Sequence, residues 1–527
     1  MAIAADVKRI GRLISWYFAT VGVLAHLAVV GAIAFLVVAF PMPLPLFAAK
    51  VVKHAESVVP WLAVPLDRGF TLIGADPDAP PPTRATTAGP PLDRWTGQGA
   101  SAAAPRLTQI YDAQGRPAGT RPFAPTDITG RAVEVATMRG LIAAVAAARP
   151  GDVITLAPGV YRSRVSQGII TTIPGTADRP ITVRADRLGA VKIEIEATIG
   201  FKIASPYWIF ENLDIGGVCA RHSTCEHAFQ VIGRGRSLVL RNNRLHDFNA
   251  PIKGNGIEID GARSFPDDAL IENNSIYNNT PRKTDNPVTL VDVVGADRWT
   301  LRANLIADFA KDGGNHVSYA AFLKGNSADG VFERNLVVCE MRLTGGTRVG
   351  LSLGGGGTGT SSCRDGDCSV EHRGGIIRDN IIMNCPDVGI YLNRARDTKI
   401  YNNTLYQTLG IDVRFSTSTA DIRNNILDGR ILDRDGGTST VADNLIASEG
   451  AWFGAWFGGR DFATWFVDPA RIDFTLANGA RIVDRGAALA DVGDDFCGRA
   501  RDDGRPDLGA IEYGAARPCD PRSMVPR

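Results

Sequence analysis

The sequence predicts an all-β protein: a right-handed parallel β-helix, a single-stranded solenoid with an N-terminal capping helix, preceded by one transmembrane helix. The first observation is a recurring segment in which an apolar residue stands three positions before an Asn and two mostly apolar residues follow it. The segments are FENLDI, LRNNRL, IENNSI, LRANLI, FERNLV, IRDNII, IYNNTL, IRNNIL and VADNLI. Their asparagines are Asn212, Asn243, Asn274, Asn304, Asn335, Asn380, Asn403, Asn425 and Asn444.

The second observation is the spacing of these asparagines, which is 31, 31, 30, 31, 45, 23, 22 and 19 residues. Repeats of about 20–50 residues are typical of solenoids, whereas a propeller blade needs about 40–45. Each repeat holds short β-rich runs and no helical periodicity. Stacked coils that bury their apolar faces against one another explain this pattern.

The recurring Asn has a structural interpretation. The stretch Ile400–Thr408, IYNNTLYQT, matches the N-x-[ST] pattern for glycosylation, but Asn273-Asn274-Ser275 matches it at an equivalent position. Asn tolerates the left-handed conformation that ends a strand, and a buried amide needs hydrogen-bond partners. We therefore expect a ladder in which each Asn bonds its neighbours in the coils above and below.

The chain divides into four predicted regions. Residues 1–45 form a cytoplasmic N-terminus and a transmembrane signal-anchor, since residues 13–40 are apolar and follow Lys8, Arg9 and Arg12. Residues 46–132 hold a juxtamembrane helix over 47–59 and a Pro/Ala/Gly-rich linker. Residues 133–447 form the β-helix, and residues 448–527 form a C-terminal closing segment. The predicted location is the inner membrane, with a single span and the β-helix in the periplasm or outside.

The β-helix is expected to begin with a short Ala-rich helix. Thr137 can cap its N-terminus and Pro150-Gly151 ends it, after which residues 153–156 read as the first strand.

Eight cysteines agree with an oxidising compartment. Cys219 with Cys225, Cys363 with Cys368 and Cys497 with Cys519 are predicted disulfides. Cys339 and Cys385 fall near one another on adjacent coils, where they either bond or pack. The formal net charge of +1 gives no case for nucleic acid as a partner.

The sequence resembles right-handed β-helix proteins of the pectate-lyase-like superfamily. AAVAAARPGDVITLAPGVYR is similar to their N-terminal cap and first coil, and GRPDLGAIEYG to their closing segment. In chondroitinase B and alginate lyases of this superfamily, a catalytic lysine and an arginine lie on adjacent coils, with acidic calcium ligands before the lysine. The resemblance puts Lys324 at the lysine position, in AAFLKGNSADGVFERN, and Gly354 near the arginine position with Arg348 close by. Calcium is possible, although Tyr319–Phe322 supplies no acidic ligand.

Four segments read as equivalent strands of one face: GIEIDGA, VTLVDVVGA, AAFLKGNSA and VGLSLGGGG. The candidate catalytic residues on or beside them are Asp260, Asp292, His316, Lys324 and Arg348. The candidate substrate-binding residues are Lys253, Glu258, Tyr391, Arg394 and Arg414. The Gly-rich excursion in the long repeat, LGGGGTGTSSCRDGDC, is expected to shape a groove.

Two chemistries fit these residues. In β-elimination on a uronic acid, a base removes the C5 proton while a cation neutralises the carboxylate, which suits Lys324 and Arg348. In hydrolysis, two carboxylates such as Asp260 and Asp292 act as acid and base. An enzyme acting on an acidic polysaccharide, most plausibly a lyase, is the first hypothesis. A non-catalytic polysaccharide-binding or envelope scaffold is the second.

Structural interpretations remain open for several of these residues. Asp292 and Lys324 can form one surface ion pair between coils, and His316 can be a loop hydrogen-bonder. Residues 371–373, Glu-His-Arg, are expected to form a solvated rim of the excursion. The aromatic segment 452–466 is expected to cap the last coil.

Overall fold

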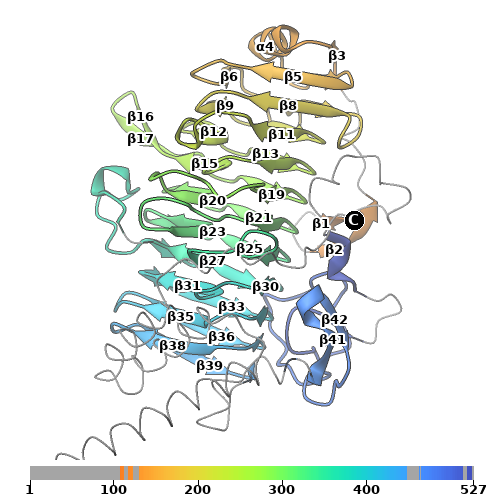
Figure 1. Cartoon of the computed structure of the whole chain (residues 1–527), viewed down its shortest axis with the longest axis vertical. Helices are drawn as coiled ribbons and strands as arrows, with labels where there is room; N and C mark the ends of the chain where they lie inside the picture. Colours follow the sequence, from red (N-terminus) through yellow and green to blue (C-terminus); the bar gives the residue numbers. More distant parts are fainter. Residues whose placement is uncertain are drawn as a thin grey trace, which may run out of the picture. The chain divides into compact units, whose positions relative to one another are not determined.

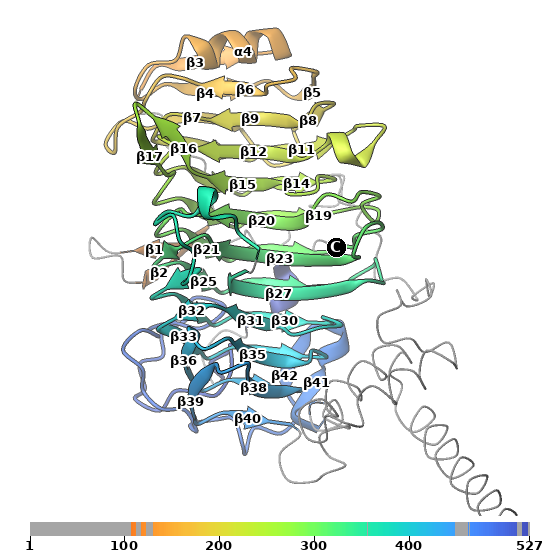
Figure 2. The same ribbon diagram turned by 90° about the vertical axis from the view of Figure 1, so that its left-hand side faces the viewer.

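The computed structural model describes residues 107–111, 117–122, 130–355, 357–447, 462, 464–513 and 519–524. Most of these residues form a stack of coils (Figures 1 and 2). The predicted span in 1–45 and the predicted helix over 47–59 lie outside these residues. Among the residues described, no helix has the length and apolar character needed to cross a bilayer.

Each coil contributes short strands to three parallel sheets, which confirms the predicted parallel β-helix. The first sheet contains β3 (Ala132–Val135), β4 (Val153–Leu156), β7 (Ile181–Ala185), β10 (Trp208–Glu211), β13 (Val239–Arg241), β18 (Leu270–Glu272), β21 (Thr300–Arg302), β25 (Val331–Glu333), β29 (Ile376–Arg378), β33 (Thr398–Tyr401), β36 (Thr419–Arg423) and β39 (Thr438–Ala442). The second contains β5 (Gly159–Ser163), β8 (Val191–Ile195), β11 (Asp214–Gly217), β14 (Arg244–His246), β19 (Ser275–Tyr277), β22 (Leu305–Ala307), β26 (Leu336–Val338), β30 (Ile381–Met383), β34 (Thr404–Tyr406), β37 (Ile426–Leu427) and β40 (Leu445–Ile446). The third contains β6 (Ile169–Thr171), β9 (Ile199–Ile203), β12 (His227–Ile232), β15 (Ile252–Asn255), β20 (Val288–Val294), β23 (Val317–Lys324), β27 (Thr347–Gly354), β31 (Ile390–Asn393), β35 (Gly410–Arg414) and β38 (Arg430–Arg434).

The remaining described elements are not part of the three long sheets. They are β1 (Leu107–Tyr111), β2 (Pro117–Pro122), α4 (Met138–Ala146), η2 (His222–Thr224), β16 (Ile257–Ile259), β17 (Ala262–Ser264), β24 (Ser327–Ala328), η3 (Thr360–Ser362), β28 (His372–Arg373), β32 (Ala395–Arg396), β41 (Phe466–Asp468), η5 (Pro469–Arg471), β42 (Asp473–Leu476) and η6 (Pro521–Met524). The hairpin β1–β2 lies inside the segment that the sequence predicts as a linker.

Helix α4 lies at the first coil, where Thr137 accepts a hydrogen bond from the Gly140 amide at 3.1 Å. Its residues Leu141 and Val145 are buried in the same core that fills the coils. The apolar inward positions of the three sheets form this single core, which is why each coil needs its neighbours.

The Asn ladder is confirmed at eight of the nine positions. From Asn243 to Asn425, each of these asparagines donates both its backbone and its side-chain N–H to the Oδ1 of the ladder Asn in the next coil, at 2.8–3.1 Å. The side-chain amide also donates back to a carbonyl of the preceding coil, as Asn335 does to Leu301 at 2.9 Å. From Asn243 to Asn425, the side-chain amides of the ladder are therefore satisfied by the stacking itself.

Two details of the ladder correct the prediction. Asn212 stands one position out of register: it pairs with Asn242, and the ladder position of its coil is Leu213, whose amide donates to Asn243 Oδ1 at 3.0 Å. The left-handed residue is also the one before the ladder position. Its φ lies between 51° and 62° at the nine corners from Asn212 to Asp443, including 51° at Asn402. These residues form a second column, which we call the corner column.

The four predicted cysteine pairs are all bonded. Cys219–Cys225, Cys363–Cys368 and Cys497–Cys519 are disulfides, as is Cys339–Cys385, whose Cα atoms on adjacent coils lie 4.9 Å apart. The last pair resolves the alternative that the sequence left open.

The C-terminal segment, which contains β41 and β42, packs along the side of the stack (Figure 1). Phe462, Trp465 and Phe466 are buried together with outward side chains of the second sheet; the Phe462 and Tyr406 rings lie 5.2 Å apart. The expectation that the aromatic segment caps the last coil is therefore wrong for its described residues.

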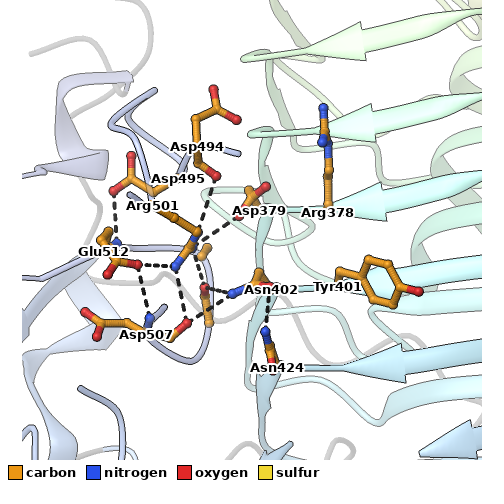
Figure 3. Close-up of polar contacts among 12 residues, drawn as sticks. Arg378, Asp379, Tyr401, Asn402, Asn424, Asp494, Asp495, Arg501, Asp507 and Glu512 are labelled. Atoms are coloured by element: carbon orange, nitrogen blue, oxygen red, sulfur yellow. Dashed lines mark hydrogen bonds and ion pairs between the residues drawn. The ribbon is translucent and has the colours of Figure 1, made fainter. Parts of the chain in front are cut away.

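The corner column fastens this segment through a buried ionic network (Figure 3). Arg501 pairs with Asp379 at 3.2 Å and with Glu512 at 2.5 Å, and Asn402 donates to the Asp507 carbonyl at 3.0 Å. Burial raises the pKa of Glu512 to about 7, an increase that Arg501 opposes. Breaking such a network leaves an uncompensated buried charge, which costs about 3–5 kcal/mol.

We expect Asn335→Ala to lower the free energy of unfolding by about 3–5 kcal/mol, because it leaves several buried groups of adjacent coils unpaired. Asn444→Ala is the matched control, since Asn444 is partly exposed at the end of the ladder. Denaturant unfolding of both variants measures the difference. Equal losses would contradict a cooperative ladder.

The raised pKa of Glu512 predicts a pH-dependent stability. The folded state holds the Glu512 proton more tightly than the unfolded state, so the protein loses stability as pH rises from 4.5 through about 7. Glu512→Gln removes this loss, and its stability relative to the parent is expected to rise by about 1–3 kcal/mol over that window.

Glu333→Gln is the control of opposite sign. Burial opposes the ionised form of Glu333, but neighbouring arginines prevail and lower its pKa to about 2. The carboxylate therefore stabilises the fold above pH 4.5 and loses this effect as pH falls towards 2. Thermal unfolding across pH 2–8 tests both variants, and parallel pH profiles for parent and Glu512→Gln would refute the first expectation.

Candidate functional site

A groove of about 990 Å³ lies on the outer face of the third sheet. Outward side chains of β15, β20 and β23 form its floor, and the hairpin β16–β17 and the Gly-rich excursion form walls, as predicted for the excursion. The lining residues are Lys253, Asn255, Gly256, Ile257, Glu258, Arg263, Phe265, Asp285, Pro287, Val288, Thr289, Asp292, Val294, Lys311, Asn315, Val317, Tyr319, Phe322, Lys324, Gly355, Gly357, Thr358, Gly359, Ser361 and Ser362.

The strand register brings the predicted cations and Asp292 together. Lys253, Asp292 and Phe322 stand in line on β15, β20 and β23, and Lys324 lies two positions further along β23, opposite Val294. Strands of a sheet lie about 4.8 Å apart, so these side chains are neighbours. Lys253 Nζ pairs with Asp292 Oδ2 at 2.7 Å, so the ion pair predicted between Asp292 and Lys324 is formed with Lys253 instead.

Lys324 ends β23 in a half-buried position on the groove floor. Its Nζ lies 4.5 Å from the centroid of the Phe322 ring. Within the described part of the chain, the Lys324 side-chain amine makes no hydrogen bond or ion pair, while its backbone carbonyl accepts from the Gly295 amide at 2.7 Å. Burial lowers the pKa of Lys324, and the Lys253 charge lowers it further, while the Asp292 and Glu371 carboxylates oppose the shift. A larger share of this amine is therefore neutral near pH 7, as a general base requires.

Glu371 is a site residue that the sequence analysis missed. Its Oε2 accepts hydrogen bonds from the Gly325 amide at 2.7 Å and from the Thr358 hydroxyl at 3.0 Å, which ties the excursion to the residue after Lys324. Burial raises the pKa of this carboxyl. The long insertion before Glu371 removes it from the repeat, so the spacing of the asparagines could not place it beside Lys324.

The solvated rim predicted for residues 371–373 is wrong for Glu371 and His372, whereas Arg373 is exposed as expected. Glu371 and His372 are buried, and His372 Nδ1 lies 2.7 Å from Ser327 Oγ in the small sheet β24–β28–β32. Burial lowers the pKa of His372 to about 3. The expectation fails because the excursion ends in a strand that rejoins the coils, which covers these side chains.

Arg348 does not reach the groove. It is fully buried at the start of β27, where it is in register with Ser318, and it donates to the carbonyls of Cys339, Leu343 and Gly345. The predicted catalytic role is therefore wrong: this guanidinium satisfies the carbonyls of the loop that precedes its own strand.

The carboxylate pair predicted for hydrolysis is not formed. GIEIDGA is the hairpin β16–β17 and not a strand of the third sheet, with Asp260 at its exposed tip, 3.0 Å from Arg234. Glu258 from the same hairpin does line the groove. The predicted equivalence of GIEIDGA with the strands of the third sheet is wrong because β15 and β16 are consecutive in the chain and both alternate between apolar and other residues. The sequence pattern therefore does not distinguish the hairpin strand β16 from the sheet strand β15.

The other candidates lie outside the groove lining. Arg414 donates to the Tyr391 hydroxyl at 3.3 Å, and Arg394 and Arg414 both lie over the Phe415 ring, on strands beyond β27. His316 precedes β23, with its Nδ1 3.4 Å from the Lys311 carbonyl. The register thus unites Lys253, Asp292 and Lys324, and Glu258 joins them in the groove lining. Tyr391 continues the column of Asp292 and Phe322, two coils beyond Phe322.

The groove residues do not fit calcium. Calcium takes 6–8 oxygen ligands. Asp292 pairs with Lys253 through Oδ2, which leaves one oxygen, and no group of three or more His, Cys, Asp or Glu side chains that could hold a metal occurs among the described residues. The cations at hand for a substrate carboxylate are lysines.

Comparisons with known proteins find similarity to β-helix enzymes. The model of a family described as "Periplasmic copper-binding protein (NosD)" matches residues 357–448. Pectate lyase L of Dickeya chrysanthemi is 29% identical over 119 residues, which are 19% of this chain and 28% of that protein. The chain therefore spans little more than a quarter of that relative.

Two solved structures illustrate the likeness of fold. Pectate lyase Pel9A is 17% identical with a TM-score of 0.49, covering 74% of this chain and 98% of that one. A rhamnogalacturonan lyase is 12% identical with a TM-score of 0.42, covering 72% and 96%. The three stacked parallel sheets by themselves confirm the β-helix fold that the predicted resemblance implies.

The environment of Lys324 predicts the effect of Lys253→Met. Removing the Lys253 charge also frees Asp292 to face Lys324, and both changes favour the charged amine. The pKa of Lys324 is therefore expected to rise towards that of an ordinary lysine. NMR titration of the protein after reductive ¹³C-methylation of its lysines measures this shift. A pKa that stays unchanged or falls would show that Lys253 does not act on Lys324.

Proposed function

We propose that the chain is a polysaccharide lyase that cleaves an acidic polysaccharide by β-elimination. The observation that carries this proposal is Lys324: an amine with a lowered pKa and no partner among the described residues, on the floor of a groove that also holds an Asp-anchored lysine. This combination suits proton abstraction beside a carboxylate.

In the proposed reaction, neutral Lys324 Nζ removes the C5 proton of a uronate residue in the groove. The C5–H electrons form the C4–C5 double bond, and the C4–O bond to the next sugar breaks. The leaving oxygen takes a proton from water, and the Lys324 ammonium returns its proton to the solvent, so one chain becomes two, of which one carries an unsaturated end. Because C5–H is acidified by the adjacent carboxylate, a cation on that carboxylate stabilises the charge that develops in the transition state.

Lys253 is the proposed cation for this task. Asp292, in the coil between those of Lys253 and Lys324, fixes the Lys253 ammonium group on the groove floor at 2.7 Å. A positioned charge that needs no reorganisation stabilises a developing anion more than a mobile one does. The task that a metal performs in other enzymes is here given to a protein side chain. The likeness to pectate lyase L over 119 residues supports this class of reaction.

The setting that we propose is an exported domain held at a membrane by residues 13–40. Four disulfides among the described residues are typical of an oxidising compartment. The acidic polysaccharide is then a component of the cell envelope or its surroundings.

The proposal predicts turnover of a uronate polymer by the full-length chain. Polygalacturonate, alginate and chondroitin sulfate are to be incubated with the protein, and the ultraviolet absorbance of the new double bond measured. Lys324→Ala is expected to lower kcat by about 10²–10⁴-fold because the general base is lost.

Lys202→Ala is the matched control, since Lys202 stands in the same outward column on β9 but outside the groove. Its turnover is expected to equal that of the parent. Undiminished turnover by Lys324→Ala would refute the assigned base, and turnover of none of the polymers would favour a non-catalytic binding protein.

A further inference from the structure

Two insertions meet above the groove and form a bridge. One is the hairpin region 256–265, which continues from β15, and the other is the stretch 357–364 of the Gly-rich excursion, which leaves β27. We call these two stretches together the bridge. Figure 2 shows β16–β17 and the excursion on the side where the arrows of the third sheet end.

Arg263 joins the two halves of the bridge. Its guanidinium donates from the hairpin to the carbonyls of Ser361 and Cys363 in the excursion. The Cys363–Cys368 disulfide closes the excursion at this point. Because the excursion carbonyls are fixed by a short covalent loop, one arginine is enough to hold the two insertions together across the coils between them.

Arg364 anchors the bridge to the stack below. It donates to the Gly295 carbonyl at 2.6 Å, pairs with Asp267 and Asp297, and lies 4.5 Å from the centroid of the Phe265 ring. Phe265 in turn lies against Gly295, where an added Cβ would come within 2.3 Å of the ring. The bridge is therefore a packed wall and not a loose pair of loops.

The two ends of the groove differ. At the end where β20 and β23 begin, the loops follow the coil stacking: Arg282 and Lys311 form a parallel β-bridge, and Lys311 reaches the Asp285 carbonyl at 3.2 Å. At the end where these strands finish, both halves of the bridge line the groove. A chain that runs along the strands would pass Asp285, Lys311 and Asn315 at the first end and meet the bridge at the second.

Lys324 lies at the closed end. It is the last residue of β23, and a Cβ on Gly355 would lie 3.2 Å from its Cδ, so the root of the excursion covers its side chain. The neighbouring carboxylate Glu371 holds Thr358 of the bridge at 3.0 Å. The base therefore lies directly under the wall, which leaves little length of groove beyond it.

From this geometry we propose that the groove takes the end of an acidic polysaccharide chain and releases short unsaturated products from it, instead of cutting chains internally. The inference rests on the proposed lyase function and adds the mode of attack. Arg263 is then a positioning residue for specificity, since it closes the wall against which the terminal sugar lies.

The first test compares viscosity with absorbance while the full-length protein acts on polygalacturonate or alginate. Attack at chain ends predicts that short products appear from the start and that viscosity falls slowly as absorbance rises. Arg263→Ala is expected to open the wall, so that the mean length of early products rises at least twofold and viscosity falls sooner. A rapid fall of viscosity with the parent protein would overturn the inference while leaving the lyase function in place.

Arg234→Ala is the control, because Arg234 pairs with Asp260 at the tip of the same hairpin but does not hold the excursion. It is expected to keep the product lengths of the parent. The same change of products in both variants would show that loosening the hairpin, and not opening the bridge, is responsible, and would overturn the role of Arg263.

The second test does not depend on turnover. Binding of Lys324→Ala to short oligogalacturonate and to long polygalacturonate is measured at equal mass by calorimetry. If the groove binds chain ends, the amount of bound protein is proportional to the number of ends. At equal mass the short chains present more ends, so they are expected to bind more protein. Binding in proportion to mass, or no binding, would overturn the inference. End-proportional binding by a protein that turns over no polymer would retain it and remove the lyase function.

Discussion

The hydrogen bonds of the Asn ladder are the constraint on which the rest of this structure depends. Each rung fixes one coil on the next without slippage, because a shift by one residue leaves buried amides and carbonyls of adjacent coils unpaired. The site depends on this register: Lys253, Asp292 and Phe322 are far apart in sequence and stand in line only because the ladder aligns β15, β20 and β23.

The double asparagine of IYNNTLYQT shows how one corner serves two purposes. Asn403 is a rung of the ladder, and Asn402 takes the left-handed conformation that turns the chain from the first sheet to the second. The side chain of Asn402 then points out of the corner and binds the C-terminal segment. Further along the corner column, Arg334 and Asp379 pair with the same segment. The corner column thus fixes the closing segment with the precision that the ladder gives to the coils.

Features that repeat could be predicted from the sequence, and features that interrupt the repeat could not. The nine asparagines predict the coils and the closeness of Cys339 to Cys385, because equivalent positions stack. Asp260 and Glu371 lie in or after insertions, where spacing carries no register. Arg348 was misplaced for another reason. Its strand was identified, but the side chain at this position points inwards. Side chains alternate between the two faces of a strand, so the face of a given residue can be assigned only when the register is known.

The candidate chemistry arises where the repeat and its interruptions meet. The repeat alone would leave Lys324 as a solvated side chain on a flat sheet, with an ordinary pKa. The excursion covers it, the Glu371 carboxylate ties that excursion to the adjacent Gly325 amide, and Lys253 adds a like charge two coils away. Burial of Lys324 and the positive charge of Lys253 both favour the neutral amine. The lowered pKa of Lys324 therefore arises where one insertion, the excursion, covers a rigid array of strands that carries Lys253.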